Sequence, residues 1–297
     1  MKRHAFTLIE LLIALAIIAI VVALLVVAIQ AARESAKTAE CGNRLKQLAL
    51  ACHSCQTTHK RMPPGADWFP ARSIRGGAGI GPLFFHLLPF LEQDSLYQSS
   101  RHPSAAPGLN YFDYQQVADR QLALFNCPAD PTLPTAGGAV GIKPYAASSY
   151  AANFLVFGKV DKDYRYVNAQ GRPSLGQSFP DGTSNTILLA EKYALAGAGG
   201  CHWGYWGQPT FTAFFALSIP GQTDGAVGPT APDDPRDSRF QVRPVQASAN
   251  PALCSSAHRG MNVAMADASV RNLPAGMDRF LWWAFVTPAG AEAAGGE

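Results

Sequence analysis

The stretch Ala5-Phe6-Thr7-Leu8-Ile9-Glu10 follows a short basic segment and opens an apolar run that continues from Phe6 to Ile29. Only Thr7 and Glu10 interrupt this run. At about 1.5 Å per residue, a helix over residues 6–29 spans about 36 Å, which exceeds the hydrocarbon thickness of a bilayer, about 30 Å. We therefore expect residues 6–29 to form a single transmembrane or filament-core helix, with the basic leader 1–5 in the cytoplasm and the remainder outside it.

Glu10 is the only charged residue inside the apolar run. A carboxylate there costs about 2.5–3.5 kcal/mol on insertion scales, so such a residue usually has a function. One interpretation is that Glu10 lies near the membrane surface and extends its side chain to water. The other is a partner cation: cleavage between Ala5 and Phe6 would create an amino group on Phe6, which could pair with Glu10 of a neighbouring subunit and fix the register of a polymer.

The hexapeptide from Ala5 to Glu10, ahead of a long apolar helix, resembles the processing site of type IV prepilins and type II secretion pseudopilins. In those families a membrane peptidase cuts before the Phe and the new N-terminus is methylated. The residue before the cut is usually Gly, and this chain has Ala5. The resemblance implies cleavage and N-methylation at Ala5 and Phe6, with Glu10 as the assembly-register charge. It also implies a prepilin peptidase/methyltransferase, other pilin-like subunits and membrane lipid as partners.

Composition agrees with an exported, anchored protein. Charged residues make up 15% of the 297 residues, and the net charge of +3 is too small to indicate nucleic-acid binding. No Gly-rich nucleotide-binding loop follows a strand pattern. A rival interpretation is a secreted protein cut after about Ala31, because Ala28 to Ala31 offers small residues to a signal peptidase.

The helix is expected to continue through residues 30–61. Between Gln30 and Lys60 there is no Pro, and Met62-Pro63-Pro64-Gly65 ends the pattern. Residues at spacings of 4, 3, 4, 3 and 4 form one stripe of an amphipathic helix: Cys41, Leu45, Leu48, Cys52, Cys55 and His59. We predict one helix from Phe6 to about Lys60, whose striped half packs on a globular head over residues 62–297.

Six cysteines in an extracytoplasmic chain favour disulfides, although six allow fifteen connectivities. Our hypothesis is a helix-to-head bridge between Cys41 and Cys127. Cys201 and Cys254 are further disulfide candidates.

A second hypothesis concerns the Cys52-x-x-Cys55-x-x-x-His59 stripe. With a fourth ligand such as His202 or Cys254 it would make a zinc site. Packed thiols or disulfides are the simpler interpretation, so we expect neither a metal site nor a cofactor.

The sequence of the head predicts short segments separated by turns. Residues 81–98 are predicted to be helical, residues 149–154 and 187–191 to be strands, and residues 277–285 to be a closing helix. A strand, a turn at Asp267 and a returning strand are expected over residues 262–270. Asp181-Gly182 is expected to open a tight turn.

These segments, in this order, resemble the DUF1559 (SBP_bac_10) family of pilin-like proteins with a long uncharacterised head. The matching stretches are Cys41 to Gln47, Leu87 to Gln93, Cys127-Pro128, Asp181 to Thr186 and His258 to Ala268. The last motif departs from the family's H-x9-DG pattern, because eight residues separate His258 from Asp267 and Ala268 replaces Gly. A turn that needs a positive φ at residue 268 would be strained.

The sequence gives little reason to expect an enzyme. Ser184, His258 and Asp267 can be drawn as a triad, but Ser184 is not in a Gly-x-Ser-x-Gly elbow, so we expect no catalytic residue. We expect most of one aromatic group to lie in the core, and the alternative is a surface that binds a sugar or another polymer. Its members are Trp203, Tyr205, Trp206, Phe211, Phe214 and Phe215.

The expected fold is α+β and pilin-like, with the long N-terminal helix packed on an antiparallel sheet in a head with long loops. The expected function is a structural subunit anchored in the inner membrane, with its head periplasmic or extracellular, that can assemble into a type II secretion or type IV pilus-like fibre. The alternative is a membrane-tethered module that captures a ligand such as a carbohydrate and does not polymerise. Replacing Glu10 discriminates the two, because only assembly depends on its charge.

Overall fold

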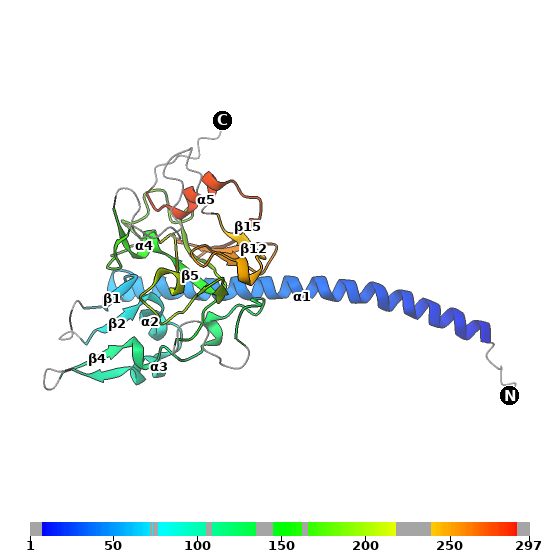
Figure 1. Cartoon of the computed structure of the whole chain (residues 1–297), viewed down its shortest axis with the longest axis horizontal. Coiled ribbons are helices and arrows are strands. Elements are labelled where there is room, and N and C mark those ends of the chain that lie inside the picture. The colour runs from blue at the N-terminus through cyan, green and yellow to red at the C-terminus, as the bar shows by residue number, and fades with distance from the viewer. Residues whose placement is uncertain are drawn as a thin grey trace.

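The computed structural model describes residues 8–71, 73, 77–104, 109–134, 145–161, 166–217 and 239–289. Its dominant element is α1, a helix of 52 residues from Leu8 to His59, which projects far beyond the head (Figure 1). At about 1.5 Å per residue it is about 78 Å long. The predicted continuous helix is confirmed over these residues. It ends where Lys60 adopts a positive φ of 62°, a common way to terminate a helix.

The two halves of α1 have different surroundings. In residues 8–29, here called the apolar half, every large apolar side chain is exposed, from Leu8 at 79% to Val21 at 48%. In residues 30–59, here called the packed half, one face is buried in the head. Its buried residues are Cys41, Gly42, Leu45, Leu48, Ala49, Ala51, Cys52 and Cys55. The predicted stripe is therefore confirmed for five of its six residues, since His59 is half-buried. The apolar half is long and apolar enough to cross a membrane.

The packed half lies on the central sheet of the head. This sheet has five strands in the order β11-β5-β8-β14-β15, and α1 contacts β14, β8 and β15. The strands are β11 (Phe214–Phe215), β5 (Tyr150–Asn153), β8 (Ile187–Glu191), β14 (Gly260–Met265) and β15 (Val270–Pro274). Every residue of β5, β8 and β14 is buried, because α1 covers one face and the rest of the head covers the other.

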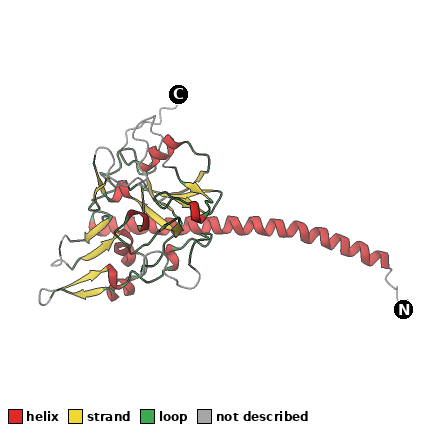
Figure 2. Cartoon of the chain, in the orientation of Figure 1, coloured by secondary structure: helices red, strands yellow, loops and turns green. Residues whose placement is uncertain are grey.

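The sheet is antiparallel, as predicted, except at its edge. The neighbouring pairs β5–β8, β8–β14 and β14–β15 are antiparallel, and β11 pairs parallel with β5. The predicted strands at residues 149–154, 187–191 and 262–270 are confirmed by β5, β8 and the β14–β15 hairpin. Figure 2 shows these strands beside the helix that crosses the head.

A second sheet of four strands has the order β1-β2-β4-β3. Its strands are β1 (Ala66–Phe69), β2 (Gly79–Pro82), β4 (Asn110–Asp113) and β3 (Arg101–Pro103). β2 and β4 are parallel, and the other two pairs are antiparallel. Both sheets are therefore mixed.

The prediction of one helical stretch over residues 81–98 is wrong. The segment begins in β2 and then divides into α2 (Leu83–Leu87), η2 (Leu88–Phe90) and α3 (Asp94–Ser99). Pro89 lies in the first turn of η2 and has no N–H for a continuing α-helix, and Glu92 adopts a positive φ of 59°. Pro89 therefore prevents α2 from continuing, and Glu92 separates η2 from α3.

The closing helix predicted over residues 277–285 is confirmed by α5 (Arg279–Val286). Asp278 caps it, accepting hydrogen bonds from the backbone N–H groups of Phe280 and Leu281. The remaining elements are short: η3 (Tyr114–Gln116), η4 (Ala123–Phe125), α4 (Phe154–Phe157), β6 (Lys159–Val160), β7 (Tyr166–Asn168), β9 (Leu195–Ala196), β10 (Gly199–Gly200), η5 (Pro209–Phe211), β12 (Gln241–Val242), η6 (Gln246–Ser248) and β13 (Ser255–Ser256).

Candidate functional site

The predicted processing site is only partly within the described structure. Ala5 and Phe6 lie outside the described residues. Glu10 lies in the first turn of α1 and is exposed, on the helix that carries the apolar half. A negative charge in the first turn of a helix also interacts favourably with the helix dipole.

A disulfide joins the packed half of α1 to the head. Cys41 on α1 is bonded to Cys127, which follows η4, with their Cα atoms 5.2 Å apart. Both residues are buried. The hypothesised bridge between these two cysteines is therefore present in the structure. It closes a loop of 86 residues, a separation for which a disulfide stabilises a fold by about 2–5 kcal/mol.

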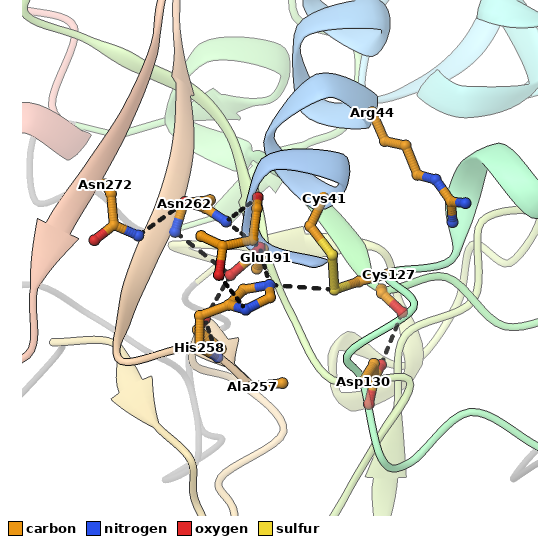
Figure 3. A network of polar contacts seen from close by, with 12 residues as sticks. Cys41, Arg44, Cys127, Asp130, Glu191, Ala257, His258, Asn262 and Asn272 are labelled. Atoms are coloured by element: carbon orange, nitrogen blue, oxygen red, sulfur yellow. Dashed lines mark hydrogen bonds and ion pairs between the residues drawn. A yellow bond between two sulfur atoms is a disulfide. The ribbon is translucent and has the colours of Figure 1, made fainter. Parts of the chain in front are cut away.

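Two ionisable side chains lie directly beside this disulfide (Figure 3). His258, before β14, places Nε2 at 3.6 Å from Cys127 Sγ and at 3.4 Å from Glu191 Oε1. Glu191 is the last residue of β8. We call Cys41, Cys127, Glu191 and His258 the disulfide cluster. All four are buried, and one ligand-type atom from each lies within 4.8 Å of the others.

The hydrogen bonds of Thr38 determine which nitrogen of the neutral His258 ring carries the hydrogen. Thr38 Oγ1 donates its only hydrogen to the backbone carbonyl of Glu34, at 3.0 Å. The same oxygen lies 3.0 Å from His258 Nδ1, so it must accept a hydrogen from that nitrogen. In the neutral ring, the lone pair of Nε2 then faces the disulfide cluster. In the protonated ring, Nε2 carries a hydrogen and pairs with Glu191.

The Glu191 carboxylate is held by neighbours on both oxygens. Ser256 donates to Oε2 at 2.5 Å, and the side-chain amide of Asn262 donates to Oε1 at 2.8 Å. Asn272 in turn donates to the side-chain oxygen of Asn262 at 2.8 Å. A buried carboxylate with these partners is fixed in position, which is the property required of a ligand or of a counter-ion.

A second buried carboxylate supports the loop that carries Cys127. Asp130 accepts hydrogen bonds from Thr132, Ser149 and the backbone N–H of Ala194, at distances from 2.7 to 2.9 Å. Burial raises the pKa of Asp130 above its ordinary value, although these hydrogen bonds oppose the shift. This residue joins two parts of the head and faces away from the sulfur atoms (Figure 3).

His258 and Asp267 do not form a common site. Asp267 is exposed at the β14–β15 turn, where it accepts a hydrogen bond from the backbone N–H of Ser269 at 2.8 Å. The next residue, Ala268, has a φ of 62°, which confirms the positive φ expected at this position. The backbone N–H of Asp267 donates to the carbonyl of Thr183 at 3.0 Å, so this motif and the 181–186 loop support each other.

The other four cysteines are buried free thiols. Cys201 and Cys254, which the sequence also offered as disulfide candidates, are not bonded in this structure. They lie near the buried ammonium group of Lys192, which donates to the carbonyls of Thr212 and Phe214 at 3.1 and 2.8 Å. Burial raises the pKa of Cys201 to about 12, so it stays a thiol at neutral pH.

The stripe Cys52, Cys55 and His59 does not gather a set of metal ligands. Burial raises the pKa of Cys55 to about 12, and His59 packs edge-on against Phe69 and Phe90. Within the described ranges, the disulfide cluster is the one group of three or more His, Cys, Asp or Glu residues whose ligand atoms converge. The helical spacing identified a packing face here and not a ligand set.

An open cleft of about 770 Å³ lies at the other end of the head. Its lining combines an aromatic ring, cationic groups and side-chain amides, including Trp68, Lys159, Asn168, Gln170 and Arg172. A neighbouring cleft of about 430 Å³ shares Trp68 and is lined also by Tyr111, Tyr114 and Trp206. We call this pair of hollows the Trp68 cleft. Sequence reasoning missed it, because its residues come from many strands and loops that are distant in the sequence.

Half of the aromatic group named from the sequence is core, and the other three residues are half-buried. Trp203, Phe214 and Phe215 are buried. Trp206 is half-buried and is the member that lines the Trp68 cleft.

Sequence reasoning also missed Glu191 and Thr38 as members of the site. Glu191 had one available signal, since a carboxylate directly ends the apolar run of β8. Thr38 had none, because a Thr on a helix surface is unremarkable until the partner ring is placed.

Comparison with known proteins confirms both resemblances drawn from the sequence. The family model described as SBP_bac_10, protein of unknown function (DUF1559), matches residues 30–279. The model described as the prokaryotic N-terminal methylation motif matches residues 1–26. No curated protein and no solved structure matches the chain. The two matched ranges include most of the apolar half, the whole packed half and all four residues of the disulfide cluster.

Proposed function

Because this chain belongs to the DUF1559 family and carries the prokaryotic N-terminal methylation motif, we propose that it is a pilin-like structural subunit. In this proposal a prepilin peptidase removes residues 1–5 and methylates Phe6. The apolar half anchors the chain in the inner membrane, and the head lies outside the cytoplasm. Assembly then transfers the apolar half from lipid into the core of a fibre of the type II secretion or type IV pilus kind.

The observation that carries the proposal is the exposure of the apolar half. An apolar surface of this length is not stable in water, and lipid or other copies of the same helix can cover it. Glu10 supports cover by other copies of the helix. Its carboxylate is costly in lipid, and the methylated amine of a neighbouring Phe6 would supply the opposite charge.

The first test is the mass of the N-terminal peptide from native membranes. The proposal predicts a chain that begins at N-methyl-Phe6, despite Ala5 before the cut. A chain that retains residues 2–5 would exclude processing, and a start near residue 32 would identify a cleaved secretory signal.

The second test separates assembly from anchoring. Glu10→Ala should abolish cross-linkable fibres while the protein remains in the membrane fraction with a folded head. Glu40→Ala is the matched control, because Glu40 is an exposed carboxylate on the same helix that pairs with Arg44 one turn away. Fibres that form normally with Glu10→Ala would contradict a register role for this charge.

A second candidate function is a tethered module that binds a ligand and does not polymerise, and the Trp68 cleft favours it. The larger hollow is lined by an aromatic ring, amides, three cations and the carboxylate of Asp67. This chemistry suits an acidic sugar, since the ring packs on the sugar face and the cations, which outnumber the carboxylate, bind the acid group of the sugar. Titration with polygalacturonate should quench tryptophan fluorescence in the wild type and much less in the Trp68→Ala variant, in which Trp206 is the remaining tryptophan of the cleft. Equal responses of the two proteins would remove this candidate. Catalysis is not part of either proposal.

A further inference from the structure

The disulfide cluster has the composition of a metal site. Its four side chains offer two sulfur atoms, one imidazole nitrogen and one carboxylate oxygen, which are the ligand types that Zn²⁺ binds in proteins. They come from α1, the loop after η4, the end of β8 and the segment before β14. Such convergence of four distant segments on one buried point requires the complete fold.

Two of the six distances among these atoms fit a tetrahedral zinc ion, and a third, between the two sulfur atoms, is a covalent bond in the oxidised chain. With Zn–S of about 2.3 Å, Zn–N of about 2.05 Å and Zn–O of about 2.1 Å, the edges of the tetrahedron are about 3.6 Å for S···N and about 3.4 Å for N···O. The structure has 3.6 Å between Cys127 Sγ and His258 Nε2, and 3.4 Å between that nitrogen and Glu191 Oε1. Two edges are therefore already at the lengths that zinc needs.

The surrounding hydrogen bonds also suit a ligand set. Thr38 accepts from His258 Nδ1, which leaves the Nε2 lone pair of the neutral ring directed at the cluster. Metal-binding histidines are commonly held through their second nitrogen in this way. The Glu191 carboxylate is likewise oriented by Ser256 and Asn262.

The cluster meets an open hollow beside the helix at one of its four residues, His258. An open hollow of about 250 Å³ is lined by Glu34, Ser35 and Thr38 of α1, and by His258, Arg259 and Asn272 of the head. An ion in this hollow lies beside His258, and the other three residues of the cluster do not line it.

We propose that the disulfide cluster is a zinc site in the reduced chain. A dithiol reductant opens the Cys41–Cys127 bond: it supplies two electrons and two protons, becomes a disulfide itself and leaves two cysteine thiols. Zn²⁺ then displaces those two protons and binds both thiolates, Glu191 and neutral His258. The two sulfur atoms separate to about 3.8 Å, the S···S edge of the zinc tetrahedron.

The consequence is a helix-to-head junction with two alternative closures. In an oxidised chain the Cys41–Cys127 bond links α1 to the head, and in a reduced chain one Zn²⁺ links the same residues. The proposal does not depend on fibre assembly, since it concerns only the packed half of α1 and the head.

The experiment uses the full chain in detergent, with zinc itself as the probe. Protein reduced with a trialkylphosphine should retain one Zn²⁺ per chain after buffer exchange, and oxidised protein should retain none. Co²⁺ in place of zinc should give the absorption of a tetrahedral site with two thiolate-to-cobalt charge-transfer contributions. This spectrum needs no variant, so it stays informative if a substitution prevents folding.

Variants then assign the ligands. Glu191→Gln and His258→Asn should each weaken zinc binding, and Thr38→Val should weaken it about 10–100-fold through the orientation of His258. The control is Cys52→Ala with Cys55→Ala, which removes two buried thiols outside the cluster and should leave zinc binding unchanged. The proposal is overturned if reduced wild type binds no zinc, if oxidised protein binds it equally, or if binding is lost only in the Cys52 and Cys55 control.

Discussion

The apolar half and the packed half of α1 are one helix in two environments. Residues 8–29 bury nothing inside the chain, whereas residues 41–55 place a continuous stripe in the core of the head. Both halves lack Pro and are rich in helix formers, so local propensity does not distinguish them. The difference lies in the pattern: apolar residues occupy every face of the first half and only one face of the second.

This comparison shows how one element serves two functions. A helix that is apolar all round has no preferred face in a single chain, so its contacts must come from lipid or from other chains. A helix with one apolar stripe has a single position on its own sheet. The head is thereby fixed on a rod whose other end remains available for insertion or assembly.

The largest effect is expected from charges in the apolar half. Ile17→Arg combined with Val21→Arg places two cations near the centre of the span, at a cost of about 5–7 kcal/mol for the pair. Membrane retention should be lost, as measured by fractionation. Leu50→Arg is the matched control, because Leu50 is an exposed apolar residue on the packed half and the change should leave retention intact. Retention of the double variant at the wild-type level would contradict a membrane-anchoring role for the apolar half.

A cavity in the packed half should lower the stability of the head and leave membrane retention unchanged. Leu45 is fully buried, so Leu45→Ala should lower the free energy of unfolding of the head by about 2–5 kcal/mol. Leu15→Ala makes the same chemical change at a position that is 57% exposed and should leave head stability unchanged. Urea denaturation in detergent, followed by tryptophan fluorescence, measures both. Equal losses would mean that the apolar half also packs on its own head.

Acid should unfold the head and spare the apolar half. His86 on α2, beside the packed half, is buried, and its Nε2 donates to the carbonyls of Asp67 and Gly81. Its Nδ1 is buried without a partner, so a second proton would place an uncompensated charge in the core. Burial lowers the pKa of His86 from 6.5 to about 4, although the two carbonyls oppose the shift.

The sign of the effect follows from that depressed pKa. As the pH falls below 6.5 the unfolded chain binds the proton first, so the contribution of His86 is complete above pH 6.5 and is lost toward pH 4. The loss is on the order of 3 kcal/mol. His86→Gln keeps a side-chain donor without a titration, so its stability should vary less over this range. Far-UV circular dichroism should show that helix signal from the apolar half remains, and an unchanged pH profile in His86→Gln would contradict the assignment.

The elements that sequence predicts correctly are those with a long or regular pattern. The 4-3-4-3-4 stripe predicts the buried face of α1, and the apolar run that ends in a turn at Asp267 predicts the β14–β15 hairpin. The segment at residues 81–98 fails because its apolar run has no period that separates one helix from three short pieces. Pro89 was visible there, but a Pro in the first turn of a new helix and a Pro that breaks one look alike in sequence.

The candidate site divides in the same way. Cys41 and Cys127 could be paired as a hypothesis, because one lies on the helix stripe and the other in the head. Glu191 could not be joined to them, since the antiparallel pairing of β8 with β14 is what brings its carboxylate to His258. His258 and Asp267 belong to one sequence motif but lie at opposite ends of β14, because His258 precedes this strand and Asp267 follows it.

The smallest effect is expected where the two halves meet the edge of the head. Glu34 lies near the start of the packed half, where its carboxylate forms an ion pair with Arg243 and lies 3.7 Å from Arg259. All three side chains are more than a third exposed, so water and salt screen the attraction, and such pairs are worth about 0–1 kcal/mol. A double-mutant cycle with Glu34→Gln and Arg243→Gln should give a coupling in this range that vanishes at high salt. A salt-independent coupling above 2 kcal/mol would mean that the head is rigidly locked at this edge. The expected small value means that the disulfide cluster and the buried stripe hold the head, while the ion pair only orients the helix as it leaves the surface.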